Sequence, residues 1–234
     1  DVQNITPDMV AAQIDAVYTD IPPAAVKIGM VSSAELICTI ADRLEAHHAR
    51  HIVLDPVMVA TSGAKLIDDD AITALTERLF PLAEVITPNI PETEVLLDLI
   101  AHRGASLDPA KWAEDTDRES TRIVSDTAME DAGRTVSEHY GCAVLVKGGH
   151  GVADASDLLY ADGVATWIHG VRVDNPNTHG TGCTLSSAIA SNLAKGEALP
   201  DAIRHAKDYL TGELGAQLNL GHGSGPMDHA WHWR

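Results

Sequence analysis

Short apolar runs alternate with longer amphipathic stretches along most of this chain. The runs cover residues 26–30, 52–55, 85–87 and 143–146, so each has only three to five residues. Runs of this length are typical of strands that are buried on both faces of a parallel sheet. Because parallel strands need a crossover between them, the intervening stretches are predicted to be helices. We therefore expect an α/β fold with a mostly parallel sheet and helices on both faces.

Three stretches outside the runs carry start signals for helices. Residues 7–19 begin with Pro7, and proline is common at the first helical position. Ser32 and Glu35 are spaced as a capping box that opens a second helix. Residues 68–70 are all Asp, which suits the positive end of a helix dipole, and Leu75 and Leu79 continue an apolar face. The predicted apolar face of the first helix consists of Met9, Val10, Ile14 and Val17.

The second half of the chain contains a predicted hairpin, two further helices and one irregular segment. Apolar runs 158–160 and 164–168 flank Asp162-Gly163, which favours a tight turn between antiparallel strands. Residues 185–193 and 202–218 are predicted to be the closing helices. Residues 98–138 carry ten acids and show little apolar periodicity before about 128, so we interpret 101–125 within them as a solvated surface excursion. The absence of repeats and low-complexity linkers in the sequence predicts a single domain.

The charge of the chain argues against one broad class of function. With 34 Asp and Glu against 16 Lys and Arg, the formal net charge is −18. Binding to nucleic acid depends on clustered Lys and Arg, so a general nucleic-acid binder is not expected. No apolar run approaches the ~20 residues that span a bilayer, and neither a membrane partner nor a leader is expected. Three widely spaced cysteines predict free thiols in a reducing compartment, the cytoplasm.

The most informative segment is Asn177-Thr-His-Gly-Thr-Gly-Cys-Thr184, which a run of small residues follows. Its two glycines permit a tight turn, and the helix predicted next would point free N–H groups back toward a bound anion. The segment matches neither a Walker A loop nor a dinucleotide-binding fingerprint. Cys183 lies at the predicted helix N-terminus, a setting that can activate a thiol as a general base. The alternative is a small side chain that fills space there.

Two charged residues stand where predicted strands end. Lys147 precedes a glycine pair, so its side chain could reach a phosphate oxygen. Asp55 precedes Pro56, which turns the chain, and could hold Mg²⁺ or a water ligand. Each also has a plain structural interpretation, as a surface lysine at a strand exit and as a turn or capping aspartate. Neither 141–153 nor 175–196 contains an acidic residue, which suits segments that meet phosphate.

Three further residues, with an amide, a carboxylate and a thioether side chain, complete the set of candidate site residues. Asn89 and Glu92 lie three residues apart at a predicted helix start, where their oxygens could bind a hydrated Mg²⁺. The same pair fits an N-cap with its capping-box partner, and the sequence leaves both interpretations open. Met30, at the end of the first apolar run, could contact a flat heterocycle or belong to the core.

Six motifs of this chain form a recognisable set. They are Lys27-Ile-Gly-Met30, Leu54-Asp-Pro-Val-Met58, Thr87-Pro-Asn-Ile-Pro-Glu92, Val146-Lys-Gly-Gly-His150, Asn177-Thr-His-Gly-Thr-Gly-Cys183 and Gly221-His-Gly-Ser-Gly-Pro226. With them the chain resembles the bacterial hydroxymethylpyrimidine and phosphomethylpyrimidine kinases of thiamine biosynthesis. The resemblance extends over nearly the whole chain except about 101–125, and it implies the three-layer ribokinase-like fold.

The resemblance also implies a reaction and a set of site residues. The chain would be an ATP- and Mg²⁺-dependent kinase that acts on a pyrimidine alcohol. Cys183 would be its base, and the backbone N–H groups of Gly180, Thr181 and Gly182 would form its anion hole. By resemblance, Lys147, Asn89, Thr178 and Asp55 bind the nucleotide, Asp55, Asn89 and Glu92 bind Mg²⁺, and Met30, Val57 and Cys183 bind the pyrimidine.

Further expectations follow from the same resemblance. Members of the family normally carry an additional N-terminal segment with a first strand and a glycine-rich turn, and the given sequence starts after it. A homodimer is expected. Two alternatives remain open: a pyridoxal kinase of the same superfamily, and a non-catalytic module that binds a pyrimidine or phosphate.

Overall fold

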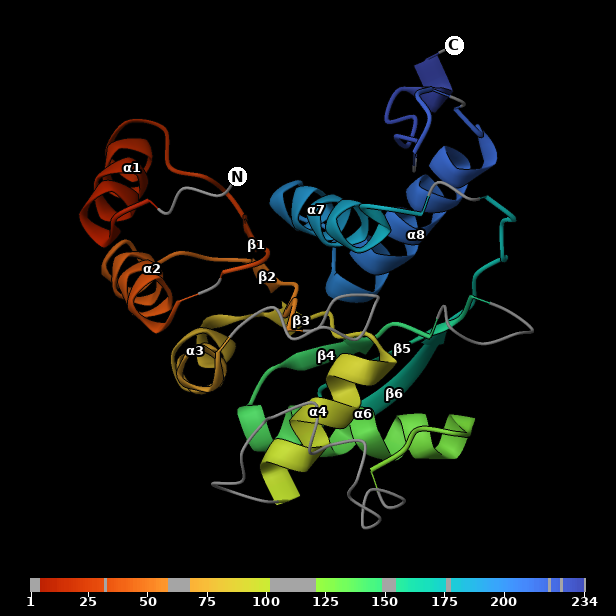
Figure 1. Ribbon diagram of the computed structural model, residues 1–234, viewed down its shortest axis with the longest axis horizontal. Helices are drawn as coiled ribbons and strands as arrows, with labels where there is room; N and C mark the ends of the chain where they lie inside the picture. Colours follow the sequence, from red (N-terminus) through yellow and green to blue (C-terminus); the bar gives the residue numbers. More distant parts are fainter. Residues whose placement is uncertain are drawn as a thin grey trace.

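The computed structural model describes residues 5–31, 33–58, 68–101, 121–148, 155–175, 178–218, 220–223 and 225–233. Strands in this part of the chain form one six-stranded sheet in the order β1-β2-β3-β4-β5-β6 (Figure 1). Neighbours from β1 to β4 pair in parallel, whereas β5 pairs antiparallel with both β4 and β6. The strands are β1 (Val26–Ile28), β2 (Ile52–Leu54), β3 (Val85–Ile86), β4 (Ala143–Val146), β5 (Asp157–Ala161) and β6 (Val164–Ile168).

The four predicted parallel strands are confirmed, although three of them end earlier than the apolar runs suggest. β2 ends at Leu54 and β3 at Ile86, each two residues before a proline. A proline has no backbone N–H for the next ladder bond, so the chain leaves the sheet there. The residues left beyond the strand ends are polar and lie at one edge of the sheet.

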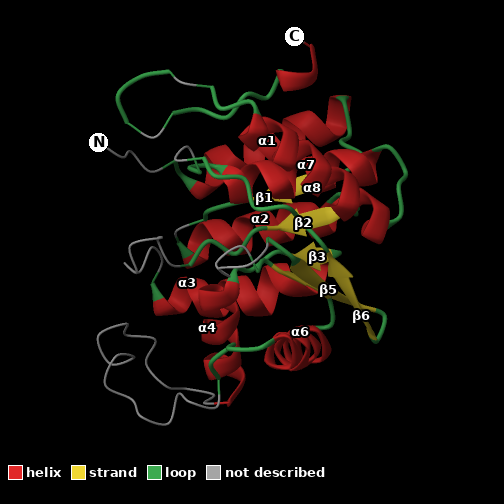
Figure 2. Cartoon of the chain, turned by 90° about the vertical axis from the view of Figure 1, so that its right-hand side faces the viewer, coloured by secondary structure: helices red, strands yellow, loops and turns green. Residues whose placement is uncertain are grey.

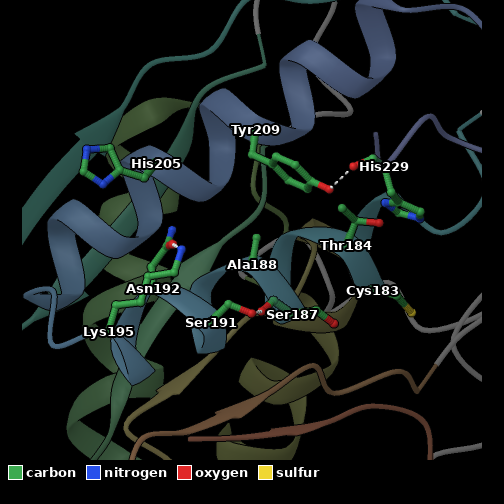
Figure 3. A pocket seen from close by; sticks show the side chains of 10 residues that line it. All are labelled: Cys183, Thr184, Ser187, Ala188, Ser191, Asn192, Lys195, His205, Tyr209 and His229. Atoms are coloured by element: carbon green, nitrogen blue, oxygen red, sulfur yellow. Dashed lines mark hydrogen bonds between the residues drawn. The ribbon is translucent and has the colours of Figure 1, made fainter. Parts of the chain in front are cut away.

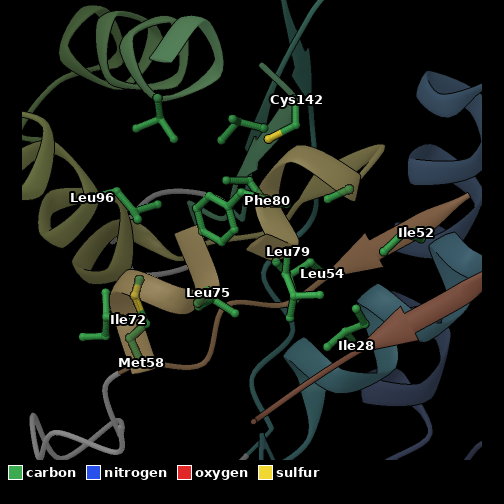
Figure 4. Packing of buried hydrophobic residues seen from close by; sticks show 14 of the residues in the cluster. Ile28, Ile52, Leu54, Met58, Ile72, Leu75, Leu79, Phe80, Leu96 and Cys142 are labelled. Carbon is green, nitrogen blue, oxygen red and sulfur yellow. The ribbon is translucent and has the colours of Figure 1, made fainter. Parts of the chain in front are cut away.

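Alternate side chains of the strands belong to two separate cores. In β4, Val144 and Val146 pack on one face, whereas Leu145 packs on the other. The first core includes Phe80 (Figure 4). It is built against α2, α3, α4 and α6. The second core is built against α7 and α8, which lie on the opposite side of the sheet from α4 and α6 (Figure 2). These helices are α2 (Ala34–Ala46), α3 (Asp69–Ala74), α4 (Ile90–Ala101), α6 (Asp126–Tyr140), α7 (Thr181–Ala194) and α8 (Leu199–Gly215).

Helix α1 (Pro7–Asp20) forms as predicted, but its predicted apolar face is not buried. Met9 and Val17 are 55% and 52% exposed. The helix packs on α2, where the ring of Tyr18 stacks on His47 with the centroids 4.7 Å apart. The apolar periodicity therefore predicted the helix correctly and its buried face incorrectly.

The predicted capping box at the start of α2 is wrong in its register. Ser33 is the N-cap, and its hydroxyl accepts a hydrogen bond from the Leu36 N–H at 3.3 Å. Ser32 lies outside the described residues. Two neighbouring serines give the same local signal, and the turn that leaves the sheet selects between them. At α3, Asp68 occupies the N-cap position as expected, but its side chain makes no capping bond.

The predicted hairpin of the second half is confirmed. Asp162 and Gly163 join β5 to β6, and their φ angles of 51° and 78° are those of a tight hairpin turn. Residues 102–120, most of the predicted surface excursion, lie outside the described residues. Among the helices that the structure describes, none is both long and apolar enough to cross a bilayer.

Candidate active site

Polar side chains that follow β2, β3 and β4 meet at the carboxyl edge of the sheet. Lys147 Nζ donates to Asp55 Oδ1 at 2.8 Å, and Thr87 Oγ1 donates to the same oxygen at 3.1 Å. The Asp55 side chain is only 3% exposed. Burial of an unpaired carboxylate is costly, and the ammonium and hydroxyl partners offset that cost here. This ion pair joins two sequence motifs that are 92 positions apart.

The predicted anion-binding turn lies against this ion pair. Gly180 is the N-cap of α7 with φ +88°, and as a glycine it provides no side-chain cap. A Cβ on Gly182 would lie 3.4 Å from Lys147 Nζ and 3.5 Å from Asp55 Oδ2. The missing side chain thus brings backbone next to both charged groups. The first turn of a helix carries free N–H groups, and together with a neighbouring ammonium it suits a phosphate.

Asn89 and Glu92 form a reciprocal capping box at the start of α4. The Asn89 N–H donates to Glu92 Oε2 and the Glu92 N–H donates to Asn89 Oδ1, both at 2.8 Å. Of the two interpretations that the sequence left open, the structure contains the cap. The cap adjoins the ion pair, because the Lys147 N–H donates to the Pro88 carbonyl at 2.8 Å. A metal-binding role for either residue stays a prediction.

Glu92 is a buried acid next to the site, and its pKa is raised. Burial raises its pKa from 4.5 to about 7, although Lys147 and the backbone N–H groups of Asn89 and Met58 favour the charged form. The negative charge of Asp55 adds to the upward shift. A carboxyl group that titrates near neutral pH next to a lysine can change its charge when a charged ligand arrives.

Cys183 opens onto a groove between α7 and α8. Its thiol is exposed and free, so it does not fill space in the core. The groove has a volume of about 520 Å³. Figure 3 shows Thr184, Ser187 and Ser191 on α7, with Tyr209 of α8 on the other wall. Cys38 is half-buried and Cys142 is buried, and neither is paired.

Three residues assigned by resemblance lie on loops at the same edge. Met30, two residues beyond β1, is 59% exposed, which excludes a core role. Val57 is half-buried directly after Pro56. Thr178 is exposed, and its carbonyl accepts a hydrogen bond from the Thr181 N–H at 3.3 Å. Motif residues Gly149, His150 and Asn177 lie outside the described part of the chain.

Sequence reasoning missed Thr87 as a partner of Asp55 and a second, buried ion pair. Lys207 Nζ bonds to Asp157 Oδ2, and Asp157 Oδ1 accepts from the Gly148 N–H at 2.9 Å. Both side chains are at most 10% exposed. Thr87 could have been found, because it follows its strand as Asp55 and Lys147 follow theirs. No local signal marks Asp157 and Lys207.

Comparisons with known proteins identify the family. The sequence model described as phosphomethylpyrimidine kinase matches residues 1–118 and 113–228. This chain belongs to the phosphomethylpyrimidine kinase family. Hydroxymethylpyrimidine/phosphomethylpyrimidine kinases of Haemophilus influenzae and Rhizobium meliloti are 38% and 42% identical to it over 98% and 99% of this chain, and 79% and 80% of theirs. A thiamine biosynthesis bifunctional protein, ThiED, of Geobacter sulfurreducens is 43% identical over 97% of this chain, which spans 42% of that protein.

Solved structures of related kinases share the fold. Phosphomethylpyrimidine kinase of Clostridium difficile superposes with a TM-score of 0.70 at 34% identity and covers 90% of this chain and 78% of its own. An ADP complex of Bacillus subtilis pyridoxal kinase superposes with a TM-score of 0.79 at 27% identity, covering 100% of this chain and 80% of its own. The predicted α/β, ribokinase-like fold is therefore confirmed for this family member.

Proposed function

We propose that this member of the phosphomethylpyrimidine kinase family transfers the γ-phosphate of ATP to 4-amino-5-hydroxymethyl-2-methylpyrimidine, and then phosphorylates the monophosphate. One observation carries the proposal. Asp55, Lys147 and the turn at Gly182 come from three distant segments, yet they meet at one edge of the sheet. A cation, a carboxylate and free helix N–H groups are what phosphoryl transfer from Mg²⁺-ATP needs.

The chain would act on the reacting groups through Cys183 and the α7 turn. The Cys183 thiolate takes the proton of the substrate hydroxyl while that oxygen attacks the γ-phosphorus. The bond from the γ-phosphorus to the bridging oxygen breaks, and this oxygen leaves on ADP. The backbone N–H groups of Gly180 and Gly182 would face the charge on the transferred group. The Thr181 N–H, which donates to the Thr178 carbonyl at 3.3 Å, would exchange that partner for the phosphate, and Lys147 Nζ lies beside Gly182. Fixed donors stabilise such a transition state because they need no reorganisation.

The donor set fits Mg²⁺, which supplies charge neutralisation to the phosphates of ATP. Asp55 Oδ2 lies on the side of Gly182, and Asn89 Oδ1 and Glu92 Oε2 each accept one backbone N–H. A carbonyl or carboxylate oxygen keeps a second lone pair for a metal or a metal-bound water. In the described part of the chain no three His, Cys, Asp or Glu residues form a metal cluster, so ATP oxygens and water would complete the coordination.

The substrates would enter at the same edge. Met30 and Val57 would contact the pyrimidine ring, and Thr178 would contact the phosphates, as the family resemblance implies. The proposal includes a homodimer in the cytoplasm. The homodimer comes from the family resemblance. The compartment comes from the free cysteines.

A pyridoxal kinase is the second candidate. The TM-score of 0.79 with Bacillus subtilis pyridoxal kinase exceeds the 0.70 with the Clostridium difficile enzyme. Sequence identity points the other way, with 27% against 34%. A non-catalytic binding module has no need of an exposed thiol next to an anion-binding turn, so Cys183 argues against it.

ADP release with three substrates distinguishes these functions. The proposal expects turnover with the hydroxymethylpyrimidine and with its monophosphate, and a loss of roughly 10²-fold in Lys147→Met. Pyridoxal as the only substrate would overturn it in favour of a pyridoxal kinase. Calorimetric binding of the pyrimidine without ADP release would instead assign a binding module.

A further inference from the structure

The C-terminal segment, residues 225–233, packs closely on α8. A Cβ on Gly212 would lie 2.1 Å from Trp231 Cζ2, so the indole rests directly on the helix backbone. Tyr209 Oη donates to the His229 carbonyl at 2.9 Å. Burial, and then the contact with Glu213, raises the pKa of Tyr209 to about 12, which keeps its hydroxyl a donor. Glycine at position 212 and the hydroxyl at position 209 thus hold the segment in one place.

An ion pair with unequal exposure adds to this attachment. His229 Nδ1 lies 2.5 Å from Glu213 Oε1, with the Glu213 side chain fully buried and that of His229 64% exposed. Within the described residues Glu213 Oε2 has no hydrogen-bond partner. Burial of a polar group is costly unless the group is hydrogen-bonded. His229 and the neighbouring Tyr209 hydroxyl are the partners that support the buried Glu213 side chain.

The same segment reaches the anion-binding turn. Met227 is buried, and its Cε lies 3.8 Å from the position of a Cβ on Gly180. His229 lines the groove onto which Cys183 opens, beside Thr184 at the N-terminal end of α7 (Figure 3). Gly180, the N-cap residue of α7, provides no side-chain cap. Contact with Met227 is thus a support that the turn receives from another part of the fold.

We propose that Glu213 and His229 are positioning residues for the anion-binding turn. By fastening the C-terminal segment to α8, they hold Met227 against Gly180 and so fix the direction of the N–H groups at the start of α7. Neither residue touches the reacting atoms. The role as stated rests on the proposed kinase function. Rates of phosphoryl transfer are sensitive to such support, since a shift near 1 Å can cost about 10²-fold.

The test compares His229→Ala with a matched control, His205→Ala. His205 lines the same groove and pairs with Glu197 at 2.7 Å, but that pair lies at the start of α8. We expect His229→Ala to lower kcat by roughly 10-fold or more with a smaller change in KM for ATP, and His205→Ala to leave both within about 2-fold. Equal kinetics of the two variants would overturn the proposal.

A double variant separates positioning from simple charge compensation. When Glu213→Gln is added to His229→Ala, the buried carboxyl group becomes a neutral amide. The contact between the two side chains that fastens the C-terminal segment is still lost. We expect it to stay as slow as His229→Ala at temperatures where circular dichroism shows both folded. Recovery of the parent kcat would overturn the proposal, because the pair would then matter only as a charge and its partner.

A measurement that does not depend on catalysis distinguishes a failure of the positioning role from a failure of the proposed kinase function. The rate at which iodoacetamide alkylates Cys183, followed by mass spectrometry, reports on the helix start that the thiol occupies. We expect this rate to change by about 3-fold or more in His229→Ala but not in His205→Ala, with Cys38 as the internal reference. An unchanged rate overturns the positioning role. If the chain has no kinase activity, the proposed function fails, and alkylation alone decides the positioning role.

Discussion

Two helices begin next to Lys147, and they treat their first N–H groups in opposite ways. At α4, Asn89 and Glu92 satisfy each other's backbone N–H groups at 2.8 Å. At α7, the N-cap residue is Gly180, which provides no side-chain cap. The first N–H groups of any helix need partners. The α4 sequence supplies side-chain partners for its own N–H groups, whereas Gly180 supplies none at α7, where the Thr181 N–H donates to the Thr178 carbonyl instead.

The difference separates a supporting helix start from a binding one. The α4 cap adjoins the strand end that carries Lys147, through the bond from the Lys147 N–H to the Pro88 carbonyl. The α7 turn faces the other end of the same residue, since Gly182 lies against Lys147 Nζ. The start of α4 thus supports the backbone of Lys147, whereas the start of α7 lies against its ammonium group. Variants on each side should differ accordingly, with activity lost at α7 and stability lost at α4.

The largest effect is expected at the α7 side, from Cys183→Ala. A general base contributes roughly 10²–10⁴-fold to rate, so kcat should fall by about that factor while ATP still binds. Steady-state kinetics and calorimetric titration with ATP measure the two quantities. Cys38→Ala is the control, because Cys38 is a half-buried, free cysteine on a different helix, α2. Near-normal kcat in Cys183→Ala would remove Cys183 from the mechanism.

Gly182 offers a graded test of how closely the turn must approach Lys147. A methyl group there would be at ordinary contact distance, 3.4 Å from Lys147 Nζ, whereas the branches of valine would reach into the ammonium and Asp55. We expect Gly182→Val to lower kcat/KM for ATP by about 10²-fold and Gly182→Ala to lower it far less. The same loss in both variants would mean that crowding of Lys147 is not the cause.

At the α4 side, Glu92→Gln should change how stability depends on pH. Because the pKa of Glu92 is raised from 4.5 to about 7, the folded protein holds this proton more tightly than the unfolded chain between those values. The contribution of Glu92 to the free energy of unfolding is therefore full below pH 4.5 and is lost as the pH rises through 7. The loss is up to about 3 kcal/mol.

Denaturant unfolding across that pH range measures this effect. Glu92→Gln should remove its share of the decline, whereas Glu35→Gln, at an exposed position near the start of α2, should not. A pH dependence that is the same in parent and Glu92→Gln would show that burial of Glu92 does not shift its titration.

The smallest effect is expected from Asn89→Ala, which removes one of the two capping bonds. Loss of an N-cap typically costs about 1 kcal/mol, and Asn89→Ser should retain most of the cap. Urea unfolding measures the loss of stability in both Asn89 variants. Ser33→Ala, which removes the N-cap of α2, is the control. A far larger loss for Asn89→Ala than for Ser33→Ala would mean that Asn89 supports more than its own helix.

The strands and most helices were predictable because their signals are local. Buried apolar runs define β1 to β4, and Asp162-Gly163 defines the hairpin turn. The errors occur where two neighbouring residues give the same local signal, or where burial depends on which other element packs against the residue. Neighbouring serines could each cap α2, and Ser33 does so. The apolar stripe of α1 predicts the helix, but whether Met9 is buried depends on what packs against it.

The candidate residues were predictable singly and their arrangement was not. Asp55, Lys147 and the glycine turn each had a plausible structural role, and no spacing in the sequence links them. Asn89 and Glu92 carried two interpretations, and hydrogen-bond geometry settled only the cap. The C-terminal support of Gly180 by Met227 carries no sequence signal, because it depends on a contact 47 residues away along the chain.

By itself, the sequence determined the alternation of strands and helices and the placement of polar residues just beyond the strand ends. These properties follow from local backbone preferences and from apolar burial, which act over a few residues. Only the tertiary structure decided that Asp55 pairs with Lys147 and that Gly182 lies against both. The physical reason is that parallel strands bring their carboxyl ends to one edge, so groups far apart in the chain share one electrostatic environment.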